Sequence, residues 1–195
     1  MKPLKILVVI GSTRQGRYGE KPAKWIQSEL STRANVEVEL VDLRDFALPF
    51  FDDARSPARG DGKYANEAVQ KWADKVASAD AFVFTAAEYN HGYTAVLKNA
   101  FDVLYPEWAK KPVGFVGYGG VGGARAIEQL RQVVIELQMA PVQAGVHIPG
   151  DIFMATVRLP TPIDPALFEP VKPKATLMID QLLWWGRALK AAREA

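Results

Sequence analysis

The chain has 195 residues, of which 49% are hydrophobic and 24% charged, and its net charge is +2. These values are typical of a globular protein, and we interpret residues 1–195 as a single domain. So small a charge argues against a nucleic-acid partner. No apolar run approaches the ~20 residues that span a bilayer, so no membrane association is expected. Cysteine is absent, which excludes disulfides and thiolate metal sites, leaving the cytoplasm as the expected location and no expected metal.

The N-terminal stretch predicts a strand, a loop and a helix in succession. Residues 6–10 are all β-branched or aliphatic, a pattern typical of a strand buried on both faces. A polar loop follows over residues 11–19, and Pro22 is placed in the first turn of a predicted helix over residues 20–33. The first N–H groups of a helix have no partner within it, and its dipole attracts negative charge. This arrangement predicts an anion site.

The residue types in this loop favour a phosphate as the anion. Ser12 and Thr13 supply hydroxyl donors, while Arg14 and Arg17 supply guanidinium donors. The loop nearly follows the nucleotide-triphosphate motif G-x-x-x-x-G-K-[ST], but Arg17 replaces the lysine and Tyr18 replaces the hydroxyl residue that holds magnesium. It also lacks the G-x-G-x-x-G of a dinucleotide site. The alternative is an ordinary turn with solvated arginines.

A long segment with no regular pattern follows the second predicted strand. That strand covers residues 36–41, where apolar and acidic residues alternate as in a partly exposed strand. The segment itself covers residues 42–64 and contains Phe46, Leu48, Phe50 and Phe51. An apolar loop of this length either packs on a partner subunit or covers a pocket. The other interpretation is that it packs under the edge of its own sheet, and the sequence does not decide between them.

The rest of the chain alternates helices with strands and ends in a proline-rich region and a helix. The predicted helices cover residues 64–78, 94–108 and 124–138, and the predicted strands cover residues 81–86, 113–116 and 141–144. Five prolines lie between residues 145 and 170, so residues 145–173 are predicted to be irregular. A final amphipathic helix is predicted over residues 174–192.

This alternation predicts an α/β fold of the flavodoxin-like type. The expected structure has three layers, α/β/α, with a five-stranded parallel sheet of order 2-1-3-4-5. Ligands bind beyond the carboxyl ends of such strands, where the loops 11–19, 87–93 and 117–123 meet. The second loop offers a carboxylate, aromatic rings, an amide and an imidazole, and five of the seven residues in the third are glycine. A flat ring with a phosphate tail, such as flavin mononucleotide (FMN), fits these features.

Three motifs resemble those of the NAD(P)H-dependent FMN reductase family, which includes related quinone, azo-dye and chromate reductases. The motifs are GSTRQGRYGEKP, AEYNHGYTAVLKNAFD and GYGGVGGARA, and the resemblance covers roughly residues 5–145. It implies a flavodoxin-like fold, FMN and NADPH (or NADH) as cofactors, and a homodimer or homotetramer with the flavin near the subunit interface. Three positions depart from the family pattern: Ala87 and Thr94 stand where proline is common, and Arg17 where serine is common.

The resemblance also assigns the cofactor-binding residues. It implies that the first loop binds the FMN phosphate through Ser12, Arg14, Arg17 and Tyr18. It implies that the second loop binds the flavin ring through Glu88, Tyr89, Asn90 and His91. The third loop lies beside the ring, at Tyr118, Gly119 and Gly120.

No catalytic side chain is expected, because in a flavoenzyme the cofactor carries the difficult chemistry. The predicted reaction passes hydride from NAD(P)H to FMN, and then to a small-molecule acceptor of the quinone, azo, metal-oxyanion or free-flavin class. Backbone N–H groups around residues 90–92 are expected to stabilise negative charge on the reduced ring.

Two other functions fit parts of the sequence. A non-catalytic, flavodoxin-like electron carrier shares the predicted architecture, although such carriers are usually acidic and this chain is slightly basic. The run GYGGVG matches the dinucleotide motif G-x-G-x-x-G, but it follows the fourth strand and lacks the acidic residue about 20 positions later. We therefore favour the FMN-dependent oxidoreductase.

Overall fold

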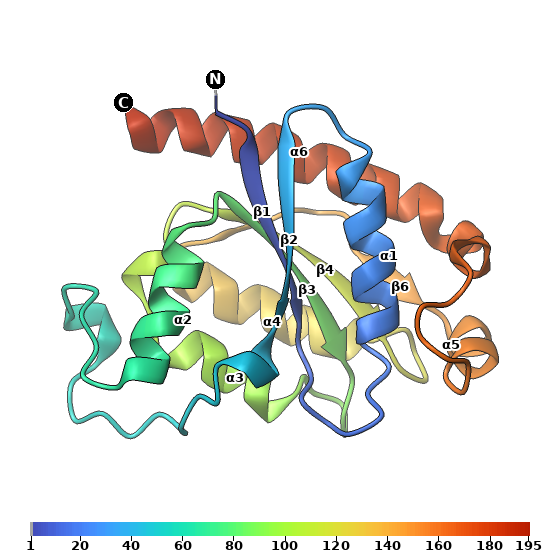
Figure 1. Ribbon diagram of the computed structural model, residues 1–195, viewed down its shortest axis with the longest axis horizontal. Coiled ribbons are helices and arrows are strands. Elements are labelled where there is room, and N and C mark those ends of the chain that lie inside the picture. Colours follow the sequence, from blue (N-terminus) through green and yellow to red (C-terminus); the bar gives the residue numbers. More distant parts are fainter. Residues whose placement is uncertain (1) are drawn as a thin grey trace.

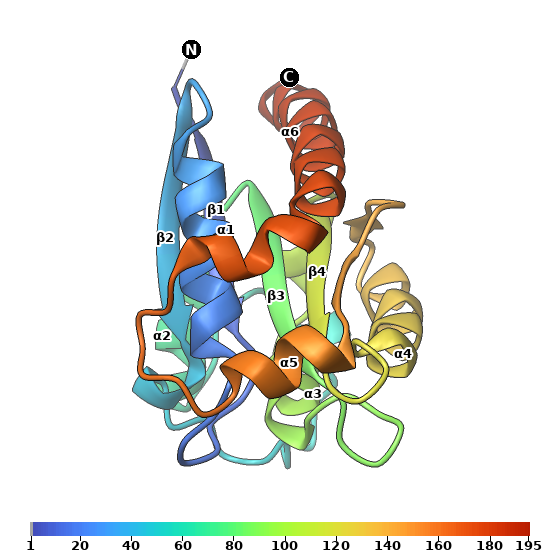
Figure 2. The same ribbon diagram turned by 90° about the vertical axis from the view of Figure 1, so that its right-hand side faces the viewer.

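A parallel β-sheet lies between two layers of helices (Figures 1 and 2). The structure is a computed structural model that describes residues 2–195. The strands lie in the order β2-β1-β3-β4-β5, and β6 also pairs with β4. All of these pairings are parallel. The strands are β1 (Leu4–Ile10), β2 (Val36–Asp42), β3 (Ala81–Ala87), β4 (Pro112–Tyr118), β5 (Ala140–Pro141) and β6 (Val146–Ile148). The predicted α/β fold and the order 2-1-3-4-5 are confirmed.

The outermost strand is divided into two parts, so the prediction of one strand over residues 141–144 is wrong. Val113 of β4 pairs with Pro141, whereas Val116 pairs with Val146, so the outer chain uses two more residues over the same span. Between the two parts, the Val142 N–H still donates to the Val113 carbonyl at 2.9 Å, but several other backbone groups bond to side chains. Arg131 donates to the carbonyls of residues 142 and 143 at 2.7 and 3.0 Å, and the N–H of residue 144 donates to Gln181 at 2.8 Å.

The helices cover the two faces of the sheet unequally. They are α1 (Glu20–Ser31), α2 (Glu67–Ala77), α3 (Ala95–Asp102), α4 (Ala124–Glu136), α5 (Gly150–Thr156) and α6 (Lys172–Glu194). One face packs against α2, α3 and α4, where Phe82 and Phe84 of β3 meet the rings of Phe101 and Trp108. The ring of Trp108 in turn meets that of Trp72 of α2. The other face packs against α1 and α6. Residues that alternate along each strand supply both cores, as expected of a parallel sheet covered on both sides.

Prolines explain two further differences from the predicted elements. The helix predicted to reach residue 108 ends at Asp102, and a separate 3-10 turn covers Pro106–Trp108, because a proline ring blocks the preceding turn of a helix. Residues 145–173 are not irregular: they contain β6, α5 and a 3-10 helix over Pro165–Val171, and α6 begins at Lys172. Prolines here stand at helix starts, at Pro149 and Pro165, where the missing N–H is not needed.

The long segment after β2 is partly packed and partly exposed. Phe46 is buried and its ring lies 4.9 Å from that of Trp72, so this part packs under its own sheet. Phe50 and Phe51 are 74% and 41% exposed. Asn99 of α3 fixes the segment, donating to the Pro49 carbonyl at 2.7 Å and accepting from the Phe51 N–H at 2.9 Å. Packing under its own sheet is therefore confirmed for Phe46, whereas packing of Phe50 and Phe51 on a partner subunit or over a pocket stays a prediction.

A buried lysine predicts that stability rises with pH in the alkaline range. Lys111 donates to the carbonyls of Val76 and Ala77 at the end of α2, at 2.9 and 3.2 Å. Burial, helped by the charge of Arg193, lowers the pKa of Lys111 from 10.5 to about 8. The unfolded chain therefore binds the extra proton between pH 8 and 10, so the free energy of unfolding increases over this interval by roughly 2–3 kcal/mol.

Urea unfolding followed by tryptophan fluorescence at pH 8, 9 and 10 measures this increase. Lys111→Met lacks this amine, so its free energy of unfolding should rise less with pH than that of the wild type, and the difference between the two proteins should grow over the interval. A difference that stays constant from pH 8 to 10 contradicts the prediction.

Candidate functional site

Three loops lie together at the carboxyl edge of the sheet, which is the lower edge in Figure 1. They follow β1, β3 and β4, and hydrogen bonds join them. The N–H of Gly11 donates to the Thr85 carbonyl at 3.1 Å, and the N–H of Glu88 donates to the Tyr118 carbonyl at 3.1 Å. The hydroxyls of Ser12 and Tyr89 are 3.1 Å apart. The sheet order thus brings the three loops singled out in the sequence into contact.

The first loop turns tightly before α1. Ser12 is buried and its hydroxyl accepts weakly from the Arg14 N–H at 3.4 Å. Gly16 has a φ of 60°, a conformation that glycine adopts without steric cost. The Arg14 side chain is exposed. Gly19 precedes α1 without a side-chain cap, so the N–H groups at this helix start are not satisfied by a capping side chain.

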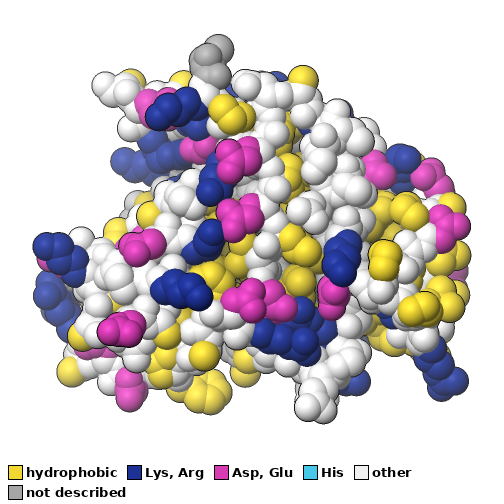
Figure 3. Space-filling model, in the orientation of Figure 1, with side chains coloured by type: hydrophobic (Ala, Val, Ile, Leu, Met, Phe, Trp, Pro, Cys, Tyr) yellow, Lys and Arg dark blue, Asp and Glu magenta, His cyan; other side chains and the backbone are white. Residues whose placement is uncertain are grey.

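Asp42 and Arg44, at the end of β2, fix this loop in place. The Arg17 guanidinium pairs with the Asp42 carboxylate and donates to the Ser12 carbonyl at 2.9 Å. Arg44 donates from Nε to the Thr13 carbonyl at 3.2 Å and from its guanidinium to the Arg14 carbonyl. Basic and acidic side chains lie side by side over the lower end of β2 (Figure 3).

These contacts keep Asp42 ionised. Burial alone would raise the pKa of Asp42, but hydrogen bonds from the Arg17 side chain and the Arg44 N–H outweigh it and lower that pKa below its ordinary value. Neither Asp42 nor Arg44 is predicted as a site residue from the sequence. The available signal is their position: Asp42 ends the strand next to β1 and Arg44 follows it, at the edge where ligands bind.

Two of the predicted cofactor residues have buried aromatic side chains. The rings of Tyr18 and Tyr118 lie 5.0 Å apart, and both contact Phe153 of α5. The Tyr18 hydroxyl bonds to that of Thr156 at 2.8 Å, so the Tyr18 side chain is directed towards α5. Burial raises the pKa of both tyrosines. In this structure the two rings belong to the core beneath the first loop, and their contact with a cofactor stays a prediction.

The second loop forms a tight turn with two residues at its tip. Tyr89 and Gly92 exchange backbone hydrogen bonds of 2.8 and 3.0 Å. Between them Asn90 and His91 have φ values of 51° and 70°. Positive φ at both central positions is the pattern of a type I′ turn and is unusual for residues other than glycine. Backbone strain of this kind is often found at functional sites.

Arg125 of α4 joins the second loop to the third. It contacts the Glu88 carboxylate, with its backbone N–H at 3.2 Å and its Nε at 2.6 Å. Its Nη1 lies 2.8 Å from Nε2 of His91, and Gln129 donates to the His91 carbonyl at 2.9 Å. A guanidinium has no acceptor, so Nε2 of His91 accepts and the ring proton is on Nδ1. Helix α4 thus fixes the positions of Glu88 and His91, two of the residues predicted to bind the flavin ring.

The third loop needs glycine for its path. Gly119, Gly122 and Gly123 have φ values of 144°, 68° and 71°. A Cβ on Gly123 would lie 2.6 Å from the Tyr118 nitrogen, and one on Gly119 would lie 3.2 Å from the Cβ of Glu88. Around Gly120 there is open space. The backbone of this loop therefore passes close to the second loop and leaves Gly120 accessible.

A pocket opens beside the first loop. Its volume is about 360 Å³, and the segment after β2 forms its far wall. The lining residues are Thr13, Leu43, Arg44, Ala47, Leu48, Phe50, Val96 and Asn99.

Comparison with known proteins identifies the family. Residues 4–151 match the family described as NADPH-dependent FMN reductase. The chain belongs to this family. The predicted resemblance is confirmed, and so is the prediction that the protein is an NAD(P)H-dependent oxidoreductase.

The relatives of this chain include yeast and bacterial enzymes. An NAD(P)H-dependent FMN reductase of Schizosaccharomyces pombe is 38% identical over 165 residues, covering 84% of this chain and 80% of the relative. An FMN-dependent NADPH-azoreductase of Staphylococcus haemolyticus is 28% identical, covering 74% of this chain and 77% of the relative. A flavoenzyme NAD(P)H:(acceptor) oxidoreductase of Paracoccus denitrificans shares the fold, with a TM-score of 0.67 and 22% identity over 92% of this chain and 97% of that one.

The three loops of this chain all lie within the matched residues, as do Asp42, Arg44 and Arg125. Helix α6 lies outside them. In the part of the chain that the structure describes, no helix has the length and apolar character needed to cross a membrane.

Proposed function

We propose that this protein binds FMN between its three loops, takes electrons from NADPH or NADH, and delivers them to a small-molecule acceptor of the quinone, azo, metal-oxyanion or free-flavin class. The observation that carries the proposal is the contact between the first and second loops. The hydroxyl of Ser12, in the loop predicted to bind phosphate, lies 3.1 Å from the hydroxyl of Tyr89, in the loop predicted to bind the ring. Because these two loops are in contact, a phosphate bound to the first loop and a flavin ring bound to the second would be parts of the same molecule.

The residues present fit a bound FMN. The first loop offers backbone N–H groups beside the start of α1, the exposed guanidinium of Arg14 and the Ser12 hydroxyl. The second loop offers the Tyr89 ring, which is 38% exposed, and the strained tip of Asn90 and His91. The third loop offers the accessible backbone of Gly120. When bound, FMN supplies the ring that accepts and returns hydride.

The protein residues contribute binding and electrostatic stabilisation to this reaction. The turn from Tyr89 to Gly92 is fixed by its own backbone bridge and by Gln129, so the N–H groups at its tip are held in place before the ligand arrives. Donors held in this way stabilise negative charge without reorganisation. Glu88 is paired with Arg125, so it serves to position the loop and is not free to act as a general base.

We also propose that the protein is a homodimer or homotetramer. Phe50 and Phe51 are exposed on the segment that forms the wall of the pocket beside the first loop, and exposed aromatic residues beside a site are typical of an interface. A second copy covering them would narrow the pocket. Equilibrium sedimentation tests this: a monomer at micromolar concentration contradicts it.

Absorbance and steady-state kinetics test the function. The protein reconstituted with FMN should keep a flavin spectrum after desalting and should oxidise NADPH or NADH continuously when a quinone, an azo dye, chromate or free FMN is added. A protein that gains no flavin absorbance contradicts the proposal. One that holds FMN tightly but shows no turnover with either nicotinamide and any of these acceptors would instead be an electron carrier.

A further inference from the structure

We propose that Arg44, acting with Asp42 and Arg17, is a positioning residue that sets the first loop to bind phosphate through its backbone N–H groups. The inference rests on the proposed function, because it concerns how FMN is held. It assigns Arg44 and Arg17 to the side of the loop that faces away from the phosphate.

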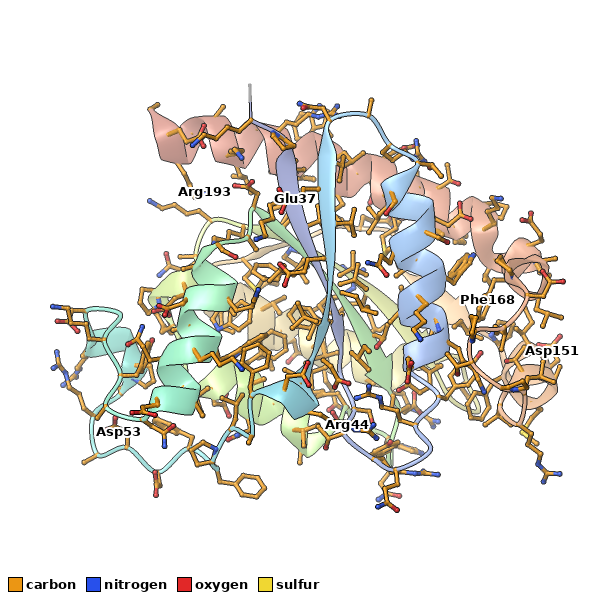
Figure 4. All side chains as sticks on the ribbon, in the orientation of Figure 1. Glu37, Arg44, Asp53, Asp151, Phe168 and Arg193 are labelled. Atoms are coloured by element: carbon orange, nitrogen blue, oxygen red, sulfur yellow. The ribbon has the colours of Figure 1, made fainter. Side chains whose placement is uncertain are left out.

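The guanidinium groups of these two arginines hold three consecutive carbonyls of the loop. Arg17 donates to the carbonyl of Ser12 at 2.9 Å. Arg44 donates to the carbonyl of Thr13 at 3.2 Å and also to that of Arg14. Both arginines also contact Asp42 at the end of β2, so we infer that their guanidinium groups approach the loop from the side of β2. Figure 4 shows Arg44 at this edge, below the end of β2.

Peptide geometry then fixes the direction of the next three N–H groups. The peptide bonds of this loop are trans, since the only cis bond in residues 2–195 is Thr161–Pro162. In a trans peptide the N–H of the following residue points opposite to the carbonyl. The N–H groups of Thr13, Arg14 and Gln15 are therefore directed away from Arg17 and Arg44. Three adjacent N–H groups on one side of a loop form an anion-binding surface.

The contact made by one of these groups, the Arg14 N–H, leads towards the second loop. The Arg14 N–H reaches the Ser12 hydroxyl at 3.4 Å, and that hydroxyl is 3.1 Å from the Tyr89 hydroxyl. The N–H surface therefore faces Tyr89, where the proposed ring site begins. A phosphate on this surface and a ring at the second loop are compatible with one ligand.

Asp42 orders both arginines. Its carboxylate pairs with Arg17 and accepts from the Arg44 N–H at 2.9 Å. The Arg17 side chain is only 4% exposed, so its guanidinium is enclosed by Asp42 and the loop. Arg17 therefore supports the phosphate by shaping the loop, and Arg14, whose side chain is exposed, is the arginine free to reach the phosphate.

The test compares the binding of FMN with that of riboflavin, which has the same ring but no phosphate. In Arg44→Met the FMN dissociation constant should rise by about 10- to 100-fold, the equivalent of one or two charge-assisted hydrogen bonds, while that of riboflavin changes less than about 2-fold. Arg44→Lys keeps the charge but lacks the planar fork that bridges two carbonyls, so it should resemble Arg44→Met. Asp42→Asn should weaken FMN binding selectively in the same way.

Arg33→Met, which removes an arginine paired with Asp180 at the opposite edge of the sheet, is the matched control and should bind both ligands normally.

Three results would overturn the proposal: an unchanged FMN affinity in Arg44→Met, an equal loss for FMN and riboflavin, or full recovery in Arg44→Lys.

A separate titration with inorganic phosphate, followed through the backbone ¹⁵N–¹H signals, keeps this inference distinct from the proposed function. A wild-type protein that fails to bind FMN but shows phosphate-dependent shifts at Thr13, Arg14 and Gln15, lost in Arg44→Met, contradicts the function and supports the inference. Absence of phosphate shifts in a wild-type protein that binds FMN overturns the inference alone, and a protein that binds neither ligand overturns both.

Discussion

Gly11→Ala is expected to destabilise the protein by roughly 1–3 kcal/mol, the usual cost of forcing an extra methyl into a packed site, and to weaken FMN binding at the same time. A Cβ at this position would lie 2.3 Å from the Thr85 carbonyl oxygen. That oxygen belongs to the backbone of β3 and cannot rotate away. Gly11 must therefore move, although its N–H bonds to the same oxygen and its carbonyl accepts from Thr94 at 2.6 Å.

Both effects come from one displacement, because Gly11 is the first residue of the loop predicted to bind phosphate. Urea unfolding gives the stability change, and fluorescence quenching of FMN gives the affinity. Gly120→Ala is the matched control for stability, since a Cβ there meets nothing within 4 Å; its free energy of unfolding should match the wild type. A Gly11→Ala protein as stable as Gly120→Ala would show that the junction between β1 and β3 is looser than the structure has it.

Arg125→Met is expected to release the second loop and to cost roughly 1–3 kcal/mol, the penalty for a buried polar group left without its partner. The Glu88 side chain is only 5% exposed and depends on Arg125 for its charged partner. The Arg125 side chain is 40% exposed, so water will screen part of the loss and the lower half of this range is expected. Riboflavin affinity should fall, because the effect is on the ring loop and not on the phosphate loop.

The double variant Glu88→Gln, Arg125→Met separates pairing from other effects. A neutral amide is less costly to leave without a charged partner, so the double variant should be more stable than Arg125→Met alone, giving a coupling energy in the double-mutant cycle. Additive single effects would contradict the proposed pairing. The tautomer of His91, measured from its imidazole ¹⁵N shifts, gives an independent reading: with Arg125 present the proton is expected on Nδ1, and the variant should lose this preference.

The sequence predicted the fold and the place of the site because both depend on local patterns. Apolar runs gave the central strands, and the polar or glycine-rich residues after them gave the three loops, which a parallel sheet gathers at one edge. The incorrect predictions arose where every residue of one type was assumed to have the same structural effect. The prolines after residue 145 predict irregular structure, yet Pro149 and Pro165 stand at the starts of helices. Pro106, inside a predicted helix, does end it.

The contacts that position the loops could not be predicted from local patterns. The sequence does not indicate that Arg17 is paired, because its partner, Asp42, lies on another strand. Nor does any sequence pattern indicate that a loop carbonyl is oriented towards Arg44. The pairing of Glu88 with Arg125 is likewise not visible in the sequence, because it depends on the packing of α4. Tyr18 follows directly after Arg17, but its side chain turns to the other side, towards α5. Pairings of this kind depend on tertiary packing.

A crystal structure of the protein with FMN bound tests the proposed site most directly. We expect the phosphate within hydrogen-bond distance of the N–H groups of Thr13, Arg14 and Gln15, and the ring between residues 88–91 and residues 118–120. Arg44 should keep its contacts with the carbonyls of Thr13 and Arg14. An FMN bound anywhere else, or a phosphate held by Arg44 on the opposite side of the loop, would contradict the arrangement described above.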